Sequence, residues 1–313
     1  MEAEQKEERG QPSPVAAARQ VYRQSMRDDV LGLAAELAYR FFLALFPFTI
    51  FMTALGGFLA QQLQVQNPAD QVVQLLGDLL PPEAAALVQA ELERVIANQN
   101  AGLLSLGALL ALFFATGGTK AIMKALNRAY GVEEGRAIWR RYVVAIALTL
   151  VAGGGILLAF VLFVPVRLIA RHLAAAVGMG DFTGVIVDVL AALGALLLLV
   201  VAASIVYRIA PNIRLPLRAV LPGAVLFALL WLAVTFGFGF YVSNFGNYAN
   251  TYGALAGVAI TLIWFYVSGL ILLVSAEVNE VIHEMTQPED VERRRQESAR
   301  QSEGDRESRR GAE

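Results

Sequence analysis

The sequence predicts an all-α protein, a polytopic membrane bundle of six transmembrane helices with both termini in the cytoplasm. Hydrophobic residues make up 57% of the 313 positions and charged residues 17%, a balance too apolar for the wetted surface of a soluble domain. The charges are crowded into the two ends and a few short connecting segments, which leaves long runs almost free of them. The fold class therefore follows from composition and from charge patterning together.

Stretches of about 20 mainly apolar residues are long enough to cross the hydrocarbon core of a bilayer. Six such stretches occur, at residues 38–60, 101–119, 142–165, 184–206, 220–243 and 253–276. The first, second and sixth are expected to continue as helix on the cytoplasmic side, because an apolar residue recurs at every third or fourth position. The expected organisation is a cytoplasmic amino-terminal segment (1–30), a membrane domain (31–286) and a charged, disordered cytoplasmic tail (287–313).

Lysine and arginine set the orientation, because short cytoplasmic loops are enriched in them. With the amino terminus inside, most of the 25 basic residues fall in cytoplasmic segments, while Arg94, Arg167 and Arg171 fall outside. An even number of spans returns the carboxyl terminus to the cytoplasm. Charge and hydropathy thus support the same count of six.

The longest outer connection, residues 61–100, is expected to contain an amphipathic helix. Pro81 and Pro82 open a stretch in which apolar residues share one helical face. This segment could lie in the outer interface or cap the bundle, and the lack of a basic polar face favours capping.

Proline and glycine mark places where helices bend or approach closely. Pro47 should kink the first span, and Pro222 is expected in the first turn of the fifth, where proline costs little. Gly253 and Gly257 form a small-xxx-small face on the sixth span. Tight packing is the favoured interpretation of these glycines, with a gating hinge as the alternative.

Polar side chains gather at the inner ends of the spans and form a candidate substrate-binding cavity. If they face inward, they line a mainly basic chamber that opens to the cytoplasm and suits an anionic head group. The alternative is a belt at the inner interface, with lysine and arginine stems reaching water. No topology rule asks for the carboxylates of Glu36 and Glu277. The candidates are Glu36, Arg40, Lys120, Lys124, Asn127, Arg136, Arg208, Asn212, Glu277 and Asn279.

Signals for enzyme chemistry are scarce. The sequence has no cysteine, and its two histidines, His172 and His283, are expected on opposite sides of the membrane. No Walker A sequence, GxSxG elbow or dinucleotide fingerprint is present. We therefore expect no catalytic residues, no metal, no cofactor and no nucleic-acid partner.

Four ordered blocks carry a family resemblance: LAAELAYRFFLALFPFTIFM (33–52), ATGGTKAIMKALNRAYGVEEGR (115–136), VYRIAPNIRLPLRAVLPGA (206–224) and YVSNFGNYANTYGALAGVAITLIWFYVSGLILLVSAEVNEVI (241–282). Through these blocks the chain resembles the YihY/BrkB family of bacterial inner-membrane proteins, once labelled ribonuclease BN. Trp264 and Glu277 match its last block, while Ala44 departs from the serine common in relatives. The resemblance implies six spans, the bacterial inner (plasma) membrane and an envelope role.

These observations favour a transporter or flippase for an anionic amphiphile, such as a lipid or lipopolysaccharide precursor. Membrane lipids are the expected partners. The alternative is a non-transporting scaffold or envelope-assembly factor. Ribonuclease activity is the weakest hypothesis, because no residue set for metal-assisted hydrolysis is visible.

Overall fold

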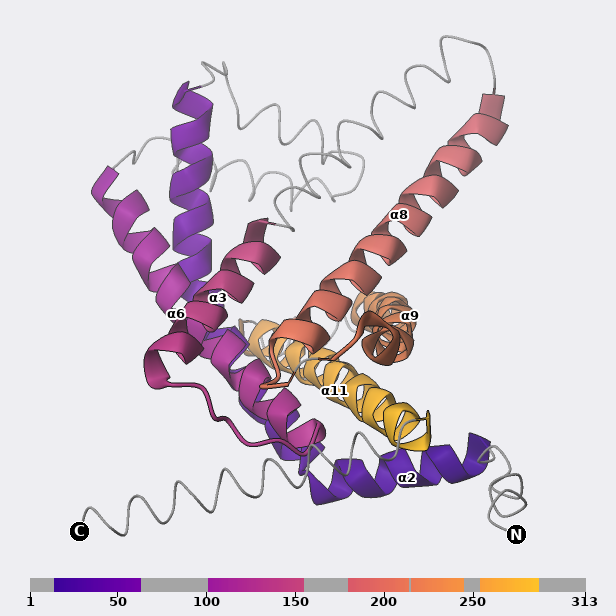
Figure 1. Cartoon of the computed structure of the whole chain (residues 1–313). Helices are drawn as coiled ribbons and strands as arrows, with labels where there is room; N and C mark the ends of the chain where they lie inside the picture. Colours follow the sequence, from indigo (N-terminus) through magenta and orange to yellow (C-terminus); the bar gives the residue numbers. More distant parts are fainter. Residues whose placement is uncertain (1–13, 63–100, 155–179, 214, 245–253, 287–313) are drawn as a thin grey trace, which may run out of the picture. The chain divides into compact units, whose positions relative to one another are not determined.

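The computed structural model describes residues 14–62, 101–154, 180–213, 215–244 and 254–286, and these residues are helical with short connections (Figure 1). Residues 138–154 form one further helical stretch. No strand occurs in these ranges, which confirms the all-α class for the described chain. The principal helices are α2 (Pro14–Arg27), α3 (Val30–Gln62), α6 (Ala101–Ala129), α8 (Gly180–Ile209), α9 (Leu217–Asn244) and α11 (Ala254–Thr286).

Within these ranges, five helices are long and apolar enough to cross a membrane. They correspond to the first, second, fourth, fifth and sixth predicted spans: Val30–Phe51, Ser105–Ala129, Ala192–Ile209, Leu217–Tyr241 and Leu255–Thr286. The third predicted span, 142–165, is helical up to residue 154 and then leaves the described residues, so six spans stay a prediction. The outer amphipathic segment and the carboxyl-terminal tail also lie outside the described residues.

The predicted helical extensions are confirmed. α6 continues unbroken to Ala129, and α11 continues through Glu277 to Thr286. α3 begins at Val30, ahead of its predicted span, and stays helical through Pro47. The expected position of Pro222 is wrong: because α9 already begins at Leu217, this proline lies in the second turn, inside the helix.

The amino-terminal segment contains a helix that was not predicted. α2 begins with Pro14, a residue whose fixed φ suits the first helical position, and ends at Arg27. Asp29 has a positive φ of 55°, and its side chain accepts a hydrogen bond from the backbone N–H of Gly32 (3.3 Å), which caps α3. α2 and α3 are therefore joined by a two-residue corner.

The chain forms two compact units. One contains residues 40–118, and in it the helices α3 and α6 approach closely at glycines. A Cβ on Gly107 would lie 3.3 Å from the backbone of Phe51, and one on Gly118 would lie 3.0 Å from the ring of Phe41. Small residues thus allow the two helices to pack, as in many membrane bundles.

The second unit contains the rest of the described chain, and its core is built on α9 and α11. α9 packs against both α8 and α11, and α11 also packs against α2 (Figure 1). An aromatic cluster joins α9 to α11. The centroid of the Trp264 ring lies 5.5 Å from that of Trp231 and 5.1 Å from that of Phe238. Gly257 is exposed with open space around it, while Gly253 lies outside the described residues.

Candidate functional site

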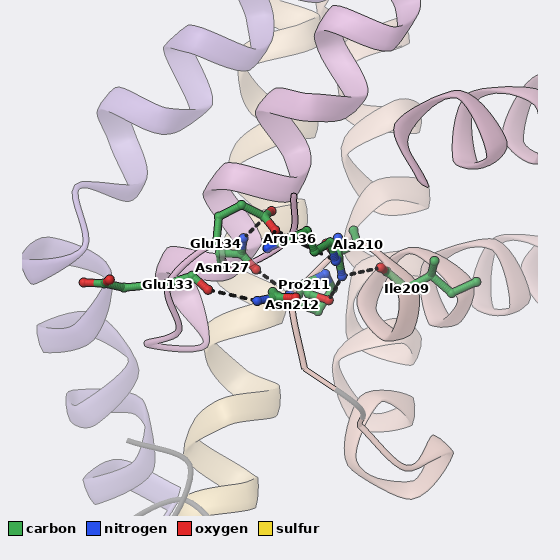
Figure 2. A network of polar contacts seen from close by, with 8 residues as sticks. All are labelled: Asn127, Glu133, Glu134, Arg136, Ile209, Ala210, Pro211 and Asn212. Carbon is green, nitrogen blue, oxygen red and sulfur yellow. Dashed lines mark hydrogen bonds and ion pairs between the residues drawn. The ribbon is translucent and has the colours of Figure 1, made fainter. Parts of the chain in front are cut away.

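The guanidinium group of Arg136 holds the end of α8. It donates hydrogen bonds to the carbonyl oxygens of Ile209 (3.2 Å), Ala210 (3.0 Å) and Pro211 (Figure 2). The last carbonyls of a helix have no intrahelical partner and carry partial negative charge, so a cation there satisfies them. Arg136 therefore acts first as a cap for the carboxyl end of α8.

Three further side chains complete this arrangement: Asn127, Glu134 and Asn212 (Figure 2). We call these three residues and Arg136 the loop clamp. The buried Asn127 side chain accepts a hydrogen bond from the backbone N–H of Asn212 (2.6 Å) and donates one to Glu134 (3.0 Å). Glu134 also accepts from the backbone N–H of Arg136 (3.2 Å). The clamp thereby ties the loop after α6 to the connection between α8 and α9.

A second polar group lies inside the helices. The side chain of Asn279, which is 0% exposed, accepts a hydrogen bond from the backbone N–H of Gly223 (2.6 Å) and donates one to the hydroxyl of Tyr130 (3.2 Å). The hydroxyl of Tyr207 donates to the carbonyl oxygen of Leu272 (2.8 Å). Buried polar groups of this kind are tolerated because their hydrogen bonds offset the free-energy cost of removing them from water.

Glu277 differs from Asn279 among the buried polar side chains of α11. It is 0% exposed, and neither of its carboxylate oxygens has a hydrogen-bond partner in the described chain. In the part of the chain that the structure describes, the charged groups that act on it are Asp28, Arg27, Glu280 and Glu284, and Arg27 is the basic one among them. Moving a carboxyl group out of water without giving it a hydrogen-bond donor costs free energy. A contribution to the stability of the fold therefore does not explain why an acid is present at position 277.

Arg27 and Asp28 stand beside this acid at the corner between α2 and α3. Their side chains form a hydrogen bond of 3.4 Å, and the Arg27 side chain is largely exposed. This bond with Asp28 raises the pKa of Arg27, which keeps the guanidinium charged. Among the described residues, the guanidinium of Arg27 thus acts on the carboxyl groups of Asp28, Glu277 and Glu284.

Most of the basic candidates outside the loop clamp lie at the surface. Lys124 forms an ion pair with Glu36 (2.8 Å), with the two side chains 55% and 27% exposed. The ammonium of Lys120 lies 3.9 Å above the ring of Tyr142, and Arg40 and Arg208 are exposed. Among the candidates, Asn127, Arg136 and Asn212 meet in the loop clamp, and Lys124 pairs with Glu36. A single chamber formed by all ten stays a prediction.

Several residues of these groups were not among the candidates. Tyr130, Tyr207, Gly223 and Glu134 each bind a buried or half-buried partner. Gly131, whose φ is 60°, ends α6 in the left-handed conformation and turns the chain toward the loop clamp. In the described residues, no group of three or more His, Cys, Asp or Glu side chains is placed to hold a metal ion.

Comparisons with known proteins agree on the family. The family model described as virulence factor BrkB matches residues 21–300. YfkH of Bacillus subtilis (strain 168), whose name describes it only as ribonuclease-like, is 39% identical over 80% of this chain and 89% of its own. A UPF0761 membrane protein of Pseudoalteromonas atlantica is 30% identical over 82% of both chains.

A second UPF0761 membrane protein, from Alkalilimnicola ehrlichii, is 32% identical over 82% of this chain but over only 56% of its own length. No solved structure matches the chain. The family model covers most of the sequence, and the relatives named as membrane proteins agree with the apolar helices. The chain is a membrane protein that belongs to the BrkB virulence factor family.

Proposed function

We propose that this protein is a transporter or flippase of the bacterial inner membrane that moves an anionic amphiphile, such as a lipid or lipopolysaccharide precursor. The observation that carries the proposal is Glu277, a fully buried acid in α11 whose carboxylate oxygens lack a hydrogen-bond partner in the described chain. Ionisable residues inside membrane helices are rare and commonly mark pathways for substrates or protons. A carboxyl group that contributes no bond to the fold is best explained by such a task.

The basic residues near the cytoplasmic ends of the helices supply the second part of the proposal. Arg208 and Arg128 are exposed, and Lys124 is more than half exposed although it pairs with Glu36. Exposed cations at this level attract the phosphate or carboxylate of an anionic head group. They would collect the amphiphile at the membrane surface before it moves past the buried acid.

The test is lipid movement in liposomes that contain the purified protein. A fluorescent phosphatidylglycerol is supplied in both leaflets, and dithionite reduces the probe from outside. The proposal predicts that the protein exposes inner-leaflet probe faster than protein-free liposomes do, with a slower rate for labelled phosphatidylcholine. Equal rates with and without protein, for both lipids, would overturn it.

A non-transporting scaffold or envelope-assembly factor is the second candidate, and the loop clamp favours it. Asn127, Arg136 and Asn212 make hydrogen bonds to other parts of the chain, and these bonds serve the fold. A scaffold needs stable surfaces and no substrate path. Crosslinking in cells that captures one defined envelope protein, together with no lipid movement in liposomes, would favour this candidate over transport.

A further inference from the structure

The helix α2 has one face that packs against the protein and an opposite face that is exposed. One face packs on α11: the side-chain amides of Gln20 and Gln24 donate hydrogen bonds to the same carboxylate oxygen of Glu284, at 2.7 and 3.0 Å. The opposite face carries Val15, Tyr22 and Met26, which are 70%, 65% and 47% exposed. These three residues are seven and four positions apart, so they form one apolar stripe along the helix.

Basic residues run along one side of this apolar stripe. Arg19 and Arg23 are exposed, and they directly follow Ala18 and Tyr22 in the sequence. Arg27 is the last residue of the helix. α2 contains no acidic residue, so every charged side chain on its outer side is a cation. Apolar residues bordered by arginine are typical of helices that lie in the interface of a membrane with anionic lipids.

Both attachments of α2 place it at the end of membrane-crossing helices. Its carboxyl end is two residues from Val30, where the first candidate span begins. Its packed face binds Glu284, which lies near the end of the span Leu255–Thr286. A helix tied to the ends of two spans lies at the level of the head groups, within reach of the bilayer surface.

We propose that the stripe of Val15, Tyr22 and Met26, with Arg19 and Arg23, docks α2 on the anionic lipids of the cytoplasmic leaflet. The apolar side chains enter the boundary between head groups and acyl chains, while the guanidinium groups bind lipid phosphates. Tyrosine suits this position, since its ring is apolar and its hydroxyl reaches water. This proposal concerns a surface apart from Glu277, and it holds whether or not the protein moves lipid.

The test uses the full chain, because the sequence has no cysteine and each probe site can be introduced singly. Tyr22→Cys and Met26→Cys are labelled with an environment-sensitive fluorophore, and the protein is placed in nanodiscs that contain phosphatidylglycerol. Ala16→Cys, an exposed position a quarter-turn around the same helix, is the control. Lipids brominated on the acyl chain should quench the probes at 22 and 26 at least about threefold more than the probe at 16.

The charge requirement is tested on the same labelled chain. Arg19→Gln with Arg23→Gln should lower the preference of α2 for phosphatidylglycerol over phosphatidylcholine by roughly 30-fold, about fivefold for each arginine. Two outcomes would overturn the proposal. One is equal quenching at all three positions. The other is energy transfer between probes on different copies without quenching by lipid, which would assign the stripe to a second copy of the chain.

Discussion

The side chain of Asn279 accepts a hydrogen bond from the backbone N–H of Gly223, with 2.6 Å between the two atoms. This contact brings the backbone of α9 against α11, since glycine has no Cβ to hold the helices apart. A Cβ added to Gly223 would lie 2.6 Å from Asn279 Cγ and would also collide with the carbonyl oxygen of Ser275. The pair therefore determines how closely the two central helices pack.

Gly223→Ala should destabilise the protein strongly. The added methyl group meets backbone and a buried amide, neither of which can move away cheaply, so we expect a loss of about 3 kcal/mol or more. Thermal unfolding in detergent, followed by size-exclusion chromatography, measures the effect. Gly257→Ala is the matched control, because open space surrounds Gly257, and its unfolding midpoint should equal that of the wild type.

Asn279→Leu should cost about 2 to 3 kcal/mol, because it leaves the buried N–H of Gly223 and the hydroxyl of Tyr130 without this partner. Tyr130→Phe removes only the second bond. A double-mutant cycle in the same unfolding assay measures how far the two residues act together. Fully additive effects would show that the bond between Asn279 and Tyr130 contributes nothing.

Arg136→Lys should loosen the connection between α8 and α9 although the charge is retained. Lysine cannot bond three carbonyl oxygens with a planar fork, and we expect a loss of about 2 kcal/mol. Hydrogen exchange of the backbone amides at positions 209, 210, 212 and 213 should become faster. Arg140→Lys, at an exposed position nearby, should leave that exchange unchanged.

Lys124→Gln should change the unfolding free energy by less than about 1 kcal/mol, because its ion pair with Glu36 is exposed to solvent. It should nevertheless weaken the binding of phosphatidylglycerol if the exposed cations collect anionic head groups. Native mass spectrometry with defined lipids compares the two properties on one preparation. A large loss of stability with unchanged lipid binding would assign Lys124 to the fold alone.

The sequence predicts the long helices well, because hydropathy and helical periodicity extend over many residues. α3, α6 and α11 run through their expected spans and their extensions. α2 was not predicted, because its apolar stripe consists of only Val15, Tyr22 and Met26, with arginine and glutamine among the residues between them. A search for amphipathic periodicity in the polar amino-terminal segment would find it.

The candidate site was only partly predictable, since many of its partners are backbone atoms. Asn127, Arg136 and Asn212 were candidates, but the carbonyl groups of residues 209–211 and the N–H of Gly223 have no signature in the sequence. Glu277 was identifiable because no topology rule requires an acid at that depth. Its lack of a partner in the described chain depends on the packing of α2 and α11 and appears only in the structure.

The rate of phosphatidylglycerol movement by Glu277→Gln, measured beside its unfolding midpoint, tests the central claim most directly. Glutamine has the same shape without the ionisable group, so we predict a rate at least about tenfold below the wild type with little change in stability. Glu133→Gln, in an exposed loop, should keep the wild-type rate. A Glu277→Gln protein that moves phosphatidylglycerol as fast as the wild type would contradict the account.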